Sequence, residues 1–161
     1  MIRFEIISEE QWNKDILQKF DDKSCKIEEH LTPFRATKHS AGYDFISPVQ
    51  TILKAHSNAL IPTGIKVCMG DAEALMIYPR SSMGFKGIRL ANTVGIIDSD
   101  YYNNEDNEGH IFVKLVNDSD EDYEINIGDK IVQGVFQKIM VTDDESDIKN
   151  ERTGGMGSTG K

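Results

Sequence analysis

The stretch 79–82, Pro-Arg-Ser-Ser, combines residue types that can bind a phosphorylated ligand. Arg80 offers a planar fork of charged donors, and the hydroxyls of Ser81 and Ser82 add further donors beside it. Proline indicates that the chain turns here, at the end of an apolar run. Taken alone, the stretch is more often an ordinary turn or a helix cap.

A second candidate is Asp98, which closes the apolar stretch 90–98 and precedes Tyr101 by three residues. A carboxylate is ionised at neutral pH and can take a proton from a water molecule that attacks a substrate. An aspartate in such a segment is more often a turn former than a base. The residue type therefore permits base chemistry without requiring it.

The third candidate is the C-terminal stretch 152–160, which is dense in glycine and carries hydroxyls, Arg152 and Met156. Glycine lets backbone N–H groups crowd around an anion, and arginine adds charged donors. This composition suits a triphosphate better than a neutral ligand. A disordered Gly/Ser terminus explains the same composition equally well.

Five blocks follow one another along the chain: 41–44, 79–81, 95–101, 128–133 and 155–160. In order and approximate spacing they resemble the five signature motifs of the trimeric dUTPase family. Five ordered matches are far more specific than any single motif. The resemblance implies an enzyme that uses Mg²⁺ to hydrolyse dUTP to dUMP and pyrophosphate. Such an enzyme limits uracil incorporation into DNA and supplies dUMP for dTMP synthesis.

The resemblance also implies an architecture, a jelly-roll-like β barrel that assembles as a homotrimer with active sites shared between subunits. Residues 1–140 would form the β domain, including a helical extension over 1–31. Residues 141–161 would form a flexible linker and a glycine-rich lid. If extended, residues 141–151 span ~36–40 Å, which is ample to reach another subunit.

Matching the motifs one by one assigns roles to single residues. Asp98 would be the general base that prepares a water for attack on the α-phosphorus. Ser81 would contact the oxygen between the α- and β-phosphates, and Tyr101 would lie against the deoxyribose and leave no room for a 2′-hydroxyl. Asp44 and Gln133 would hold Mg²⁺ or the α-phosphate through water, because magnesium keeps several waters and touches phosphates directly.

The resemblance further implies that a hairpin over 92–98 binds uracil through backbone groups and the Asn92 side chain. Cytosine would leave polar groups mismatched, a discrimination that can reach ~10⁴-fold. The other implied substrate contacts are Arg80, Ser82, Gly95, Ile97, Arg152, Met156, Gly157, Ser158 and Thr159.

The sequence departs from the family pattern at four places. Met156 stands where a phenylalanine usually stacks on uracil, and methionine covers a base less specifically. Arg152 is one residue closer to the double glycine than usual. Residues 102–108 are inserted after the third motif, and the simplest expectation for them is a longer, solvated hairpin. The segment 1–31 is longer than the usual lead-in.

Two rival functions are consistent with parts of this pattern. The dCTP deaminase branch of the same superfamily shares the arginine-serine motif and the glycine tail, but it uses a glutamate on the strand after the third motif, and 111–117 contains none. A binding or regulatory protein is the rival from another class, with 102–109 as the candidate surface for a protein partner. Because the catalytic positions all remain, such binding would be additional to catalysis.

From residue 41 onward, short apolar runs separated by Gly, Pro, Asn and Asp predict an all-β domain. The polar stretch 117–122 predicts a hairpin loop, and 142–150 predicts an exposed acidic linker. The expected strands are 43–46, 60–69, 74–78, 111–117 and 130–139.

Ahead of this region, a short helix is expected over 8–20. Ser8 and Gln11 have the spacing of a capping box, which would start the helix. An apolar stripe formed by Trp12, Ile16 and Phe20 would pack on the body of the fold.

A chain of 161 residues fits one domain, and its net charge of -9 opposes direct binding to nucleic acid. Cys25 and Cys68 have neither the spacing nor the histidine companions of a zinc site or a disulfide framework. No segment is long and apolar enough to cross a membrane, so a cytoplasmic protein is expected.

Overall fold

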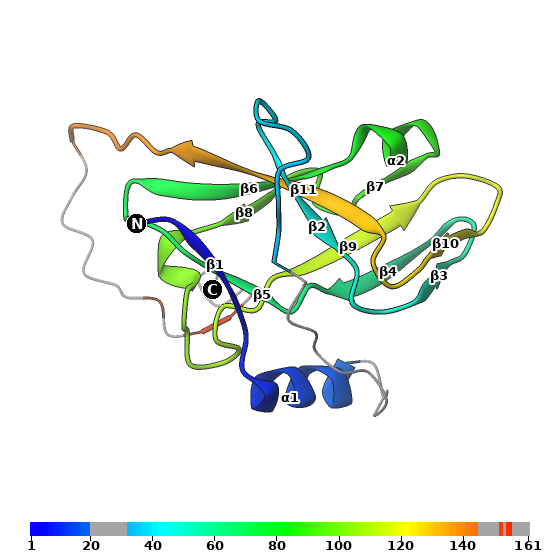
Figure 1. The fold of residues 1–161 in the computed structure, drawn as a ribbon, viewed down its shortest axis with the longest axis horizontal. Coiled ribbons are helices and arrows are strands. Elements are labelled where there is room, and N and C mark those ends of the chain that lie inside the picture. The colour runs from blue at the N-terminus through cyan, green and yellow to red at the C-terminus, as the bar shows by residue number, and fades with distance from the viewer. Residues whose placement is uncertain (20–31, 145–151, 153, 156–161) are drawn as a thin grey trace.

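Strands that alternate buried and half-exposed residues build two antiparallel sheets in the computed structural model, which describes residues 1–19, 32–144, 152, 154 and 155 (Figure 1). The first sheet has the order β2-β11-β6-β8, and the second has the order β4-β9-β7. Their strands are β2 (Tyr43–Ile46), β11 (Lys130–Lys138), β6 (Glu73–Pro79), β8 (Gly95–Ile97), β4 (Ser57–Pro62), β9 (Phe112–Asn117) and β7 (Ile88–Leu90).

Two short ladders complete the β structure. The strand β1 (Arg3–Ile6) pairs with β5 (Ile65–Cys68), and β10 (Tyr123–Ile125) pairs with β3 (Thr51–Leu53). The expected all-β, jelly-roll-like fold is confirmed. Within the described part of the chain the two sheets and the two short ladders do not join into one closed barrel.

The main core lies between the two sheets and is almost entirely apolar. It is filled from the first sheet by residues such as Phe45, Leu75 and Val132, and from the second by Ile61 and Leu115, each at most 1% exposed. Gly134, in the middle of β11, is required by this packing, because a Cβ there would lie 2.9 Å from side-chain atoms of both Leu75 and Phe45. Burial of these side chains is the main stabilising contribution to the fold.

The predicted N-terminal helix is present as α1 (Glu9–Lys19), and its apolar stripe is buried. Trp12 and Ile16 pack with Ile7, and Phe20 lies outside the described residues. The predicted capping box is half formed. The Ser8 hydroxyl accepts the Gln11 N–H at 3.0 Å, but the Ser8 N–H donates to Glu108, 100 residues away in sequence, instead of to Gln11.

Several strand predictions were wrong in detail. The expected strand 60–69 is two strands, β4 and β5, because Gly64 between them adopts a φ of 71° and donates its N–H to His110 Nε2 at 2.9 Å. Five strands, β1, β3, β7, β8 and β10, were not predicted. Each has only three or four residues, too few to show an alternating pattern.

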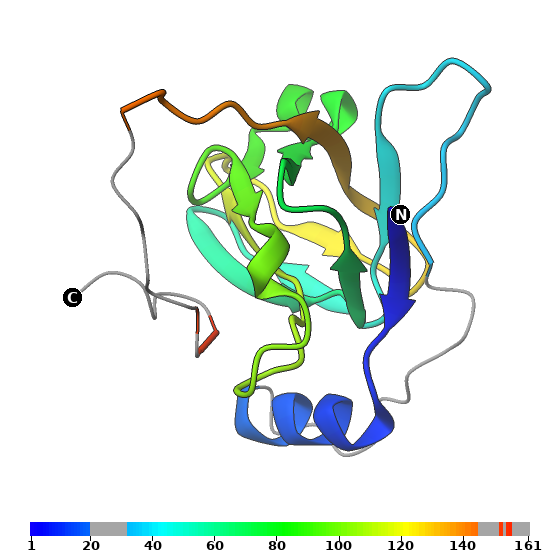
Figure 2. The same cartoon turned by 90° about the vertical axis from the view of Figure 1, so that its left-hand side faces the viewer.

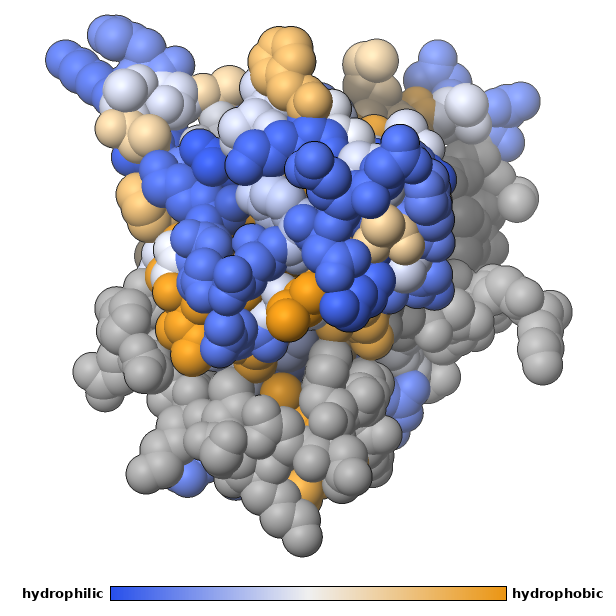
Figure 3. Space-filling model, turned by 90° about the vertical axis from the view of Figure 1, so that its right-hand side faces the viewer, coloured by the Kyte–Doolittle hydropathy of each residue, from blue (hydrophilic) through white to orange (hydrophobic). Residues whose placement is uncertain are grey.

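Neither of the two predicted hairpins is a hairpin. Residues 117–122 connect β9 to β10, and residues 91–94 connect β7 to β8. In both cases the two connected strands belong to different sheets. These connections therefore carry the chain from one sheet to another. Hydrophilic side chains cover most of the end of the molecule that bears the 117–122 connection (Figure 3), as expected for this polar stretch.

The insertion 102–108 is also not the solvated hairpin that was expected. Asn104 and Asn107 are buried in a tight loop that descends onto α1 (Figure 2). Lys14 Nζ donates to the Asp106 carbonyl at 2.9 Å, and the buried pair Asp15 and His110 is joined at 2.6 Å. The insertion and the N-terminal helix thus form one packed unit.

Glu108 makes the stability of this unit depend on pH. Burial alone would raise the pKa of Glu108, but hydrogen bonds from Ser8 and the ammonium of Lys66 outweigh it and lower the pKa. Stability from such a carboxylate is present above its unfolded pKa and is lost as pH falls through the lower folded value. We therefore expect Glu108→Gln to lower the melting temperature at about pH 7, and the difference from wild type to vanish towards about pH 3.

Thermal unfolding followed by circular dichroism across this pH range checks the prediction. Glu105→Gln is the matched control, because Glu105 is exposed in the same loop. A deficit of Glu108→Gln that persists unchanged at low pH would show that the glutamine disturbs packing and not charge.

Candidate active site

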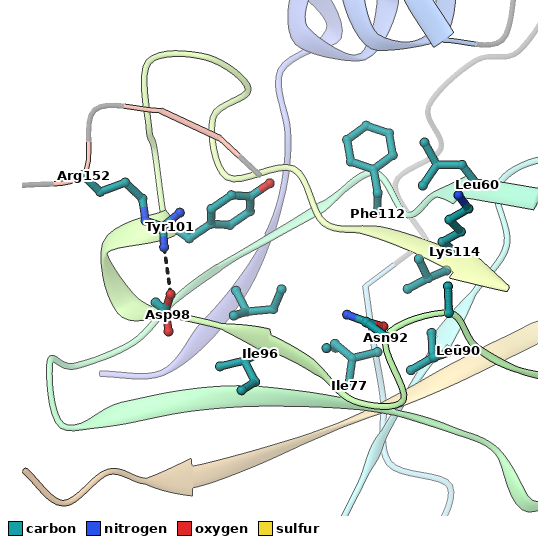
Figure 4. Close-up of a pocket in the computed structure, with 14 residues that line it drawn as sticks. Leu60, Ile77, Leu90, Asn92, Ile96, Asp98, Tyr101, Phe112, Lys114 and Arg152 are labelled. Carbon is teal, nitrogen blue, oxygen red and sulfur yellow. Dashed lines mark hydrogen bonds and ion pairs between the residues drawn. The ribbon is translucent and has the colours of Figure 1, made fainter. Parts of the chain in front are cut away.

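Six of the predicted site residues line one cavity of about 510 Å³ beside β8 (Figure 4). Its walls are mainly apolar, with contributions from β4, β6, β7 and β9, so the cavity suits a flat and partly apolar group such as a nucleoside. Leu60, Ile77, Leu90 and Phe112 belong to these walls. The six predicted residues are Asn92, Gly95, Ile97, Asp98, Tyr101 and Arg152.

Asp98 follows β8 directly and precedes a one-turn 3₁₀ helix, Ser99–Tyr101. Its side chain is half exposed, so a water molecule can reach it. Arg152 Nη2 donates to Asp98 Oδ2 at 2.8 Å, and Arg152 Nε donates to Asp100 Oδ1 at 2.9 Å. Arg152, predicted to bind phosphate, is therefore bound in this structure to the predicted base and to a second carboxylate.

Tyr101 is only 5% exposed and uses its hydroxyl inside the protein. The hydroxyl donates to the His110 carbonyl at 2.9 Å and accepts the Asn107 Nδ2–H at 2.8 Å. Burial raises the pKa of the Tyr101 hydroxyl, so it stays protonated at neutral pH. Because the hydroxyl is already engaged, the part of Tyr101 that can meet a ligand is its ring, and contact of this ring with a sugar stays a prediction.

A second cavity of about 360 Å³ collects the other predicted residues, Asp44, Arg80, Ser81, Ser82 and Gln133. Asp44 is 8% exposed and accepts from Arg80 Nε at 3.1 Å and from Lys130 Nζ at 2.8 Å. Within the described chain, the two terminal nitrogens of Arg80 have no hydrogen-bond partner. Asp44 thus orients the guanidinium while leaving part of its fork for an anion.

The residues around Asp44 do not form a metal site of their own, but they fit a magnesium ion that is bound to the phosphates of a ligand. Among the described residues, no group of three or more His, Cys, Asp or Glu side chains could hold a metal. Both Asp44 oxygens already accept from cations, and Gln133 Nε2 donates to the Pro79 carbonyl at 3.3 Å, which leaves its Oε1 as an acceptor. Contact through water is therefore the way in which Asp44 or Gln133 could serve Mg²⁺.

The two cavities share no lining residue: β6 contributes Ile77 to the larger one, and the smaller one is lined by Arg80, Ser81 and Ser82, which follow the end of β6. Ile97, just before Asp98, pairs with Leu75 on β6, and Arg80 lies five residues further along the same strand. At the usual rise of a strand, this separates the backbones of Ile97 and Arg80 by roughly 16 Å along β6, and Asp98 lies one residue further away. One chain alone therefore does not bring the predicted base and the Arg80 motif to the same phosphorus.

The sequence analysis did not identify three residues near the site, Asp100, Asp106 and Asn107. Asp100 binds Arg152 together with Asp98. This contact could have been predicted, since a carboxylate two residues after Asp98 lies near it in a tight turn. Asn107 donates to the Tyr101 hydroxyl, and Asp106 accepts the Gly155 N–H. No local sequence pattern predicted these two contacts. The predicted contacts Met156, Gly157, Ser158 and Thr159 lie outside the described residues.

Comparison with known sequences extends over most of the chain. A sequence model of the dUTPase family matches residues 28–160. The deoxyuridine 5'-triphosphate nucleotidohydrolase of Lactococcus lactis is 52% identical over 149 residues, covering 91% of this chain and 95% of that relative. The corresponding protein of Shewanella loihica is 39% identical over 136 residues, covering 80% and 86%.

Solved structures agree with the sequence comparison. The crystal structure of dUTPase from Streptococcus mutans matches with a TM-score of 0.71 at 38% identity, covering 88% of this chain and 98% of that one. A dUTPase from phage phi11 of S. aureus, in which a structural Mg(II) ion is coordinated, matches with a TM-score of 0.65 but only 19% identity, so it shows the fold alone.

Proposed function

The chain belongs to the dUTPase family and is a dUTP diphosphatase, and from this premise we propose that a water activated by Asp98 attacks the α-phosphorus of dUTP. The bond between the α-phosphorus and the bridging oxygen breaks, and dUMP and pyrophosphate leave. The observation that carries this proposal is the mainly apolar cavity that Asp98 lines together with Asn92 and Tyr101. A half-exposed carboxylate in that position can orient water and accept its proton.

The proposed catalysis depends on positioning and on cancelling negative charge, as is usual for phosphoryl transfer. Arg80 and Arg152 are the proposed phosphate ligands, with Ser81 at the bridging oxygen and Ser82 beside it. Support for Arg80 comes from its two unpartnered terminal nitrogens, held next to these hydroxyls by Asp44. Mg²⁺ carried by the phosphates would supply further positive charge, with Asp44 and Gln133 as its proposed partners through water.

Selectivity for a deoxyuridine nucleotide is proposed to arise in the larger cavity. The edge of β8 and the Asn92 side chain offer donors and acceptors to the uracil ring, with Gly95 and Ile97 supplying backbone groups. Tyr101 supports sugar discrimination, because its ring is held in place by two hydrogen bonds to its hydroxyl. A buried polar edge that is left unpaired by the wrong base costs binding energy, which is the basis of this selectivity.

We also propose that the chain acts as a homotrimer whose active sites combine groups from neighbouring subunits. The separation of roughly 16 Å along β6 between the backbones of Ile97 and Arg80, with Asp98 one residue further away, supports this, since within one chain the two groups are too far apart to act on the same phosphorus. Residues 141–161 are proposed to be a linker and a lid over a site of this kind, and residues 1–140 the β domain. The cytosol stays the predicted location, and within the described residues no helix has the length and apolar character to span a membrane.

The experiment that tests the proposed function measures pyrophosphate release from dUTP, dCTP, dTTP and UTP, each with and without Mg²⁺. We expect rapid release from dUTP with Mg²⁺ and rates lower by about 10⁴-fold for dCTP, in line with recognition of the uracil edge by hydrogen bonds. Sedimentation of the same sample should give the mass of a trimer. Release of ammonia from dCTP, or equal rates on all four nucleotides, would reject the proposal.

A further inference from the structure

Tyr101 is held at both its backbone and its hydroxyl by asparagines of the insertion 102–109. Asn104 Nδ2 donates to the Tyr101 carbonyl at 2.8 Å, and Asn107 Nδ2 donates to the Tyr101 hydroxyl at 2.8 Å. Asn107 Oδ1 accepts from Asn104 Nδ2 at 2.8 Å and from the Gly109 N–H at 3.1 Å. The buried Asn107 amide is therefore fixed through both its oxygen and its nitrogen. Buried polar groups that are all bonded in this way favour one conformation.

The other partner of the Tyr101 hydroxyl is the His110 carbonyl, which accepts from it at 2.9 Å. The side chain of His110 is fully buried, and its Nε2 accepts the Gly64 N–H at 2.9 Å. Nδ1 must then carry the ring proton, and it donates to Asp15 Oδ2 of α1 at 2.6 Å. Helix α1 and the connection between β4 and β5 thus keep the backbone of His110 in place.

The Tyr101 ring can move away from a ligand only if these hydrogen bonds stretch or break. The ring lines the larger cavity together with Asp98, and its hydroxyl points away from that carboxylate (Figure 4). A ribonucleotide in the pose proposed above would place its 2′-hydroxyl against this ring. Binding it therefore requires the ring to be displaced. The cost of that displacement, and with it the selectivity against ribose, depends on how firmly the Tyr101 hydroxyl is held.

We propose that Asn107 is a positioning residue for sugar selection. Its amide holds the Tyr101 ring against the deoxyribose, which makes the insertion 102–109 a determinant of the preference for dUTP over UTP. This inference rests on the proposed contact between Tyr101 and the sugar. Asn107 is not among the residues that line either cavity, so it acts through the Tyr101 hydroxyl. The insertion, which departs from the family pattern, then serves the same active site.

The test measures the ratio of kcat/KM for dUTP to kcat/KM for UTP. Asn107→Ala removes one of the two hydrogen bonds of the Tyr101 hydroxyl, and the net loss of one such bond typically changes an equilibrium about fivefold. We therefore expect the ratio to fall about fivefold, mainly because UTP is hydrolysed faster. Glu108→Gln is the matched control, because it weakens the same loop at a carboxylate that bonds Ser8 and Lys66. It should keep the wild-type ratio at about pH 7.

Tyr101→Phe separates a positioning role of Asn107 from a general effect on the loop. This variant keeps the ring, removes the hydroxyl through which both partners act, and leaves the hydrogen bonds within the insertion in place. We expect it to lower the ratio at least as much as Asn107→Ala does. In the Tyr101→Phe background, Asn107→Ala should lower the ratio no further, because the two changes remove the same interaction.

Asn107→Asp is the second variant at this position, for the case that the alanine variant does not fold. It keeps the oxygen that accepts from Asn104 and Gly109 but replaces the amide donor by an acceptor. The Tyr101 hydroxyl has one proton, so it can then donate either to this carboxylate or to the His110 carbonyl. One hydrogen bond remains in place of two, and the ratio should again fall.

Binding of dUMP and UMP, measured by titration calorimetry, gives a second readout that does not depend on hydrolysis. A selective wild type whose preference is unchanged in both Asn107 variants would overturn the inference and leave the proposed function intact. A fall that is equally large in Glu108→Gln, or that persists in the Tyr101→Phe background, would also overturn it, because Asn107 would then act through the stability of the loop.

Two further outcomes separate this inference from the proposed function. An inactive wild type that binds dUMP more tightly than UMP, with the preference reduced in Asn107→Ala, would reject the proposed hydrolysis and support the role of Asn107. A wild type without preference in either assay would reject the proposed contact between Tyr101 and the sugar, and the inference with it.

Discussion

Replacing Asp98 with asparagine is expected to lower kcat for dUTP about a hundredfold or more while nucleotide binding is largely kept. The substitution preserves shape but removes the charge that accepts a proton from water, and general base catalysis typically contributes ~10²–10⁴-fold. Arg152 would keep most of its contacts, since the asparagine amide oxygen can still accept from Arg152 Nη2, and the hydrogen bond from Arg152 Nε to Asp100 persists. Single-turnover rates with dUTP, together with titration of a non-hydrolysable α,β-imido analogue, separate chemistry from binding.

Asp100→Asn is the matched control for this prediction. It removes the same charge from a residue two positions away that binds the same arginine. We expect a loss of less than about tenfold, the cost of weakening one charged hydrogen bond. Equal losses in the two variants would mean that Asp98 matters only as an anchor for Arg152, and the assignment of the base would have to be abandoned.

Ending the chain at Asn150 is expected to lower kcat/KM by about a hundredfold or more and to leave the fold and the oligomer unchanged. The deletion removes Arg152 and the glycine-rich stretch, and loss of one preorganised charged donor at a phosphoryl-transfer site typically costs ~10²-fold. Among the residues that the structure describes, the last strand is β11, which ends at Lys138, so the cut lies beyond the sheet contacts seen there. Activity assays are paired with sedimentation and thermal unfolding of the same samples.

Arg152→Ala in the full-length chain shows how much of this loss is due to the guanidinium. We expect loss of the guanidinium to lower kcat/KM by at least about tenfold, because Arg152 is the cationic side chain that donates to Asp98. A shortened chain with full activity would exclude a catalytic role of residues 151–161. A shortened chain that no longer forms the wild-type oligomer would show that these residues contribute to assembly.

The insertion 102–108 illustrates where prediction from sequence ended. Its composition of Asn, Asp and Glu is typical of a solvated loop, and Asn104 and Asn107 are nevertheless buried. They satisfy each other and nearby backbone groups, so their burial costs little. Composition predicts whether a residue type is usually exposed, but it does not predict whether two neighbouring amides can form a closed network.

The capping of α1 shows the same limit at the level of a single motif. The spacing of Ser8 and Gln11 correctly predicted where the helix begins, because the hydroxyl bonds a backbone N–H only three residues away. The partner of the Ser8 N–H could not be predicted, since Glu108 arrives from a distant part of the chain and displaces the local acceptor.

Residue types and their spacing were sufficient for the fold class, for the start of α1 and, through five ordered motifs, for the family. These properties depend on side-chain chemistry and on periodicity within a few residues. Tertiary structure alone decided that Arg152 pairs with Asp98 and Asp100, that Asp44 is bonded by Arg80 and Lys130, and that Asp98 and Arg80 line two separate cavities. Such pairings follow from strand register and packing summed over the whole chain, which no local pattern records.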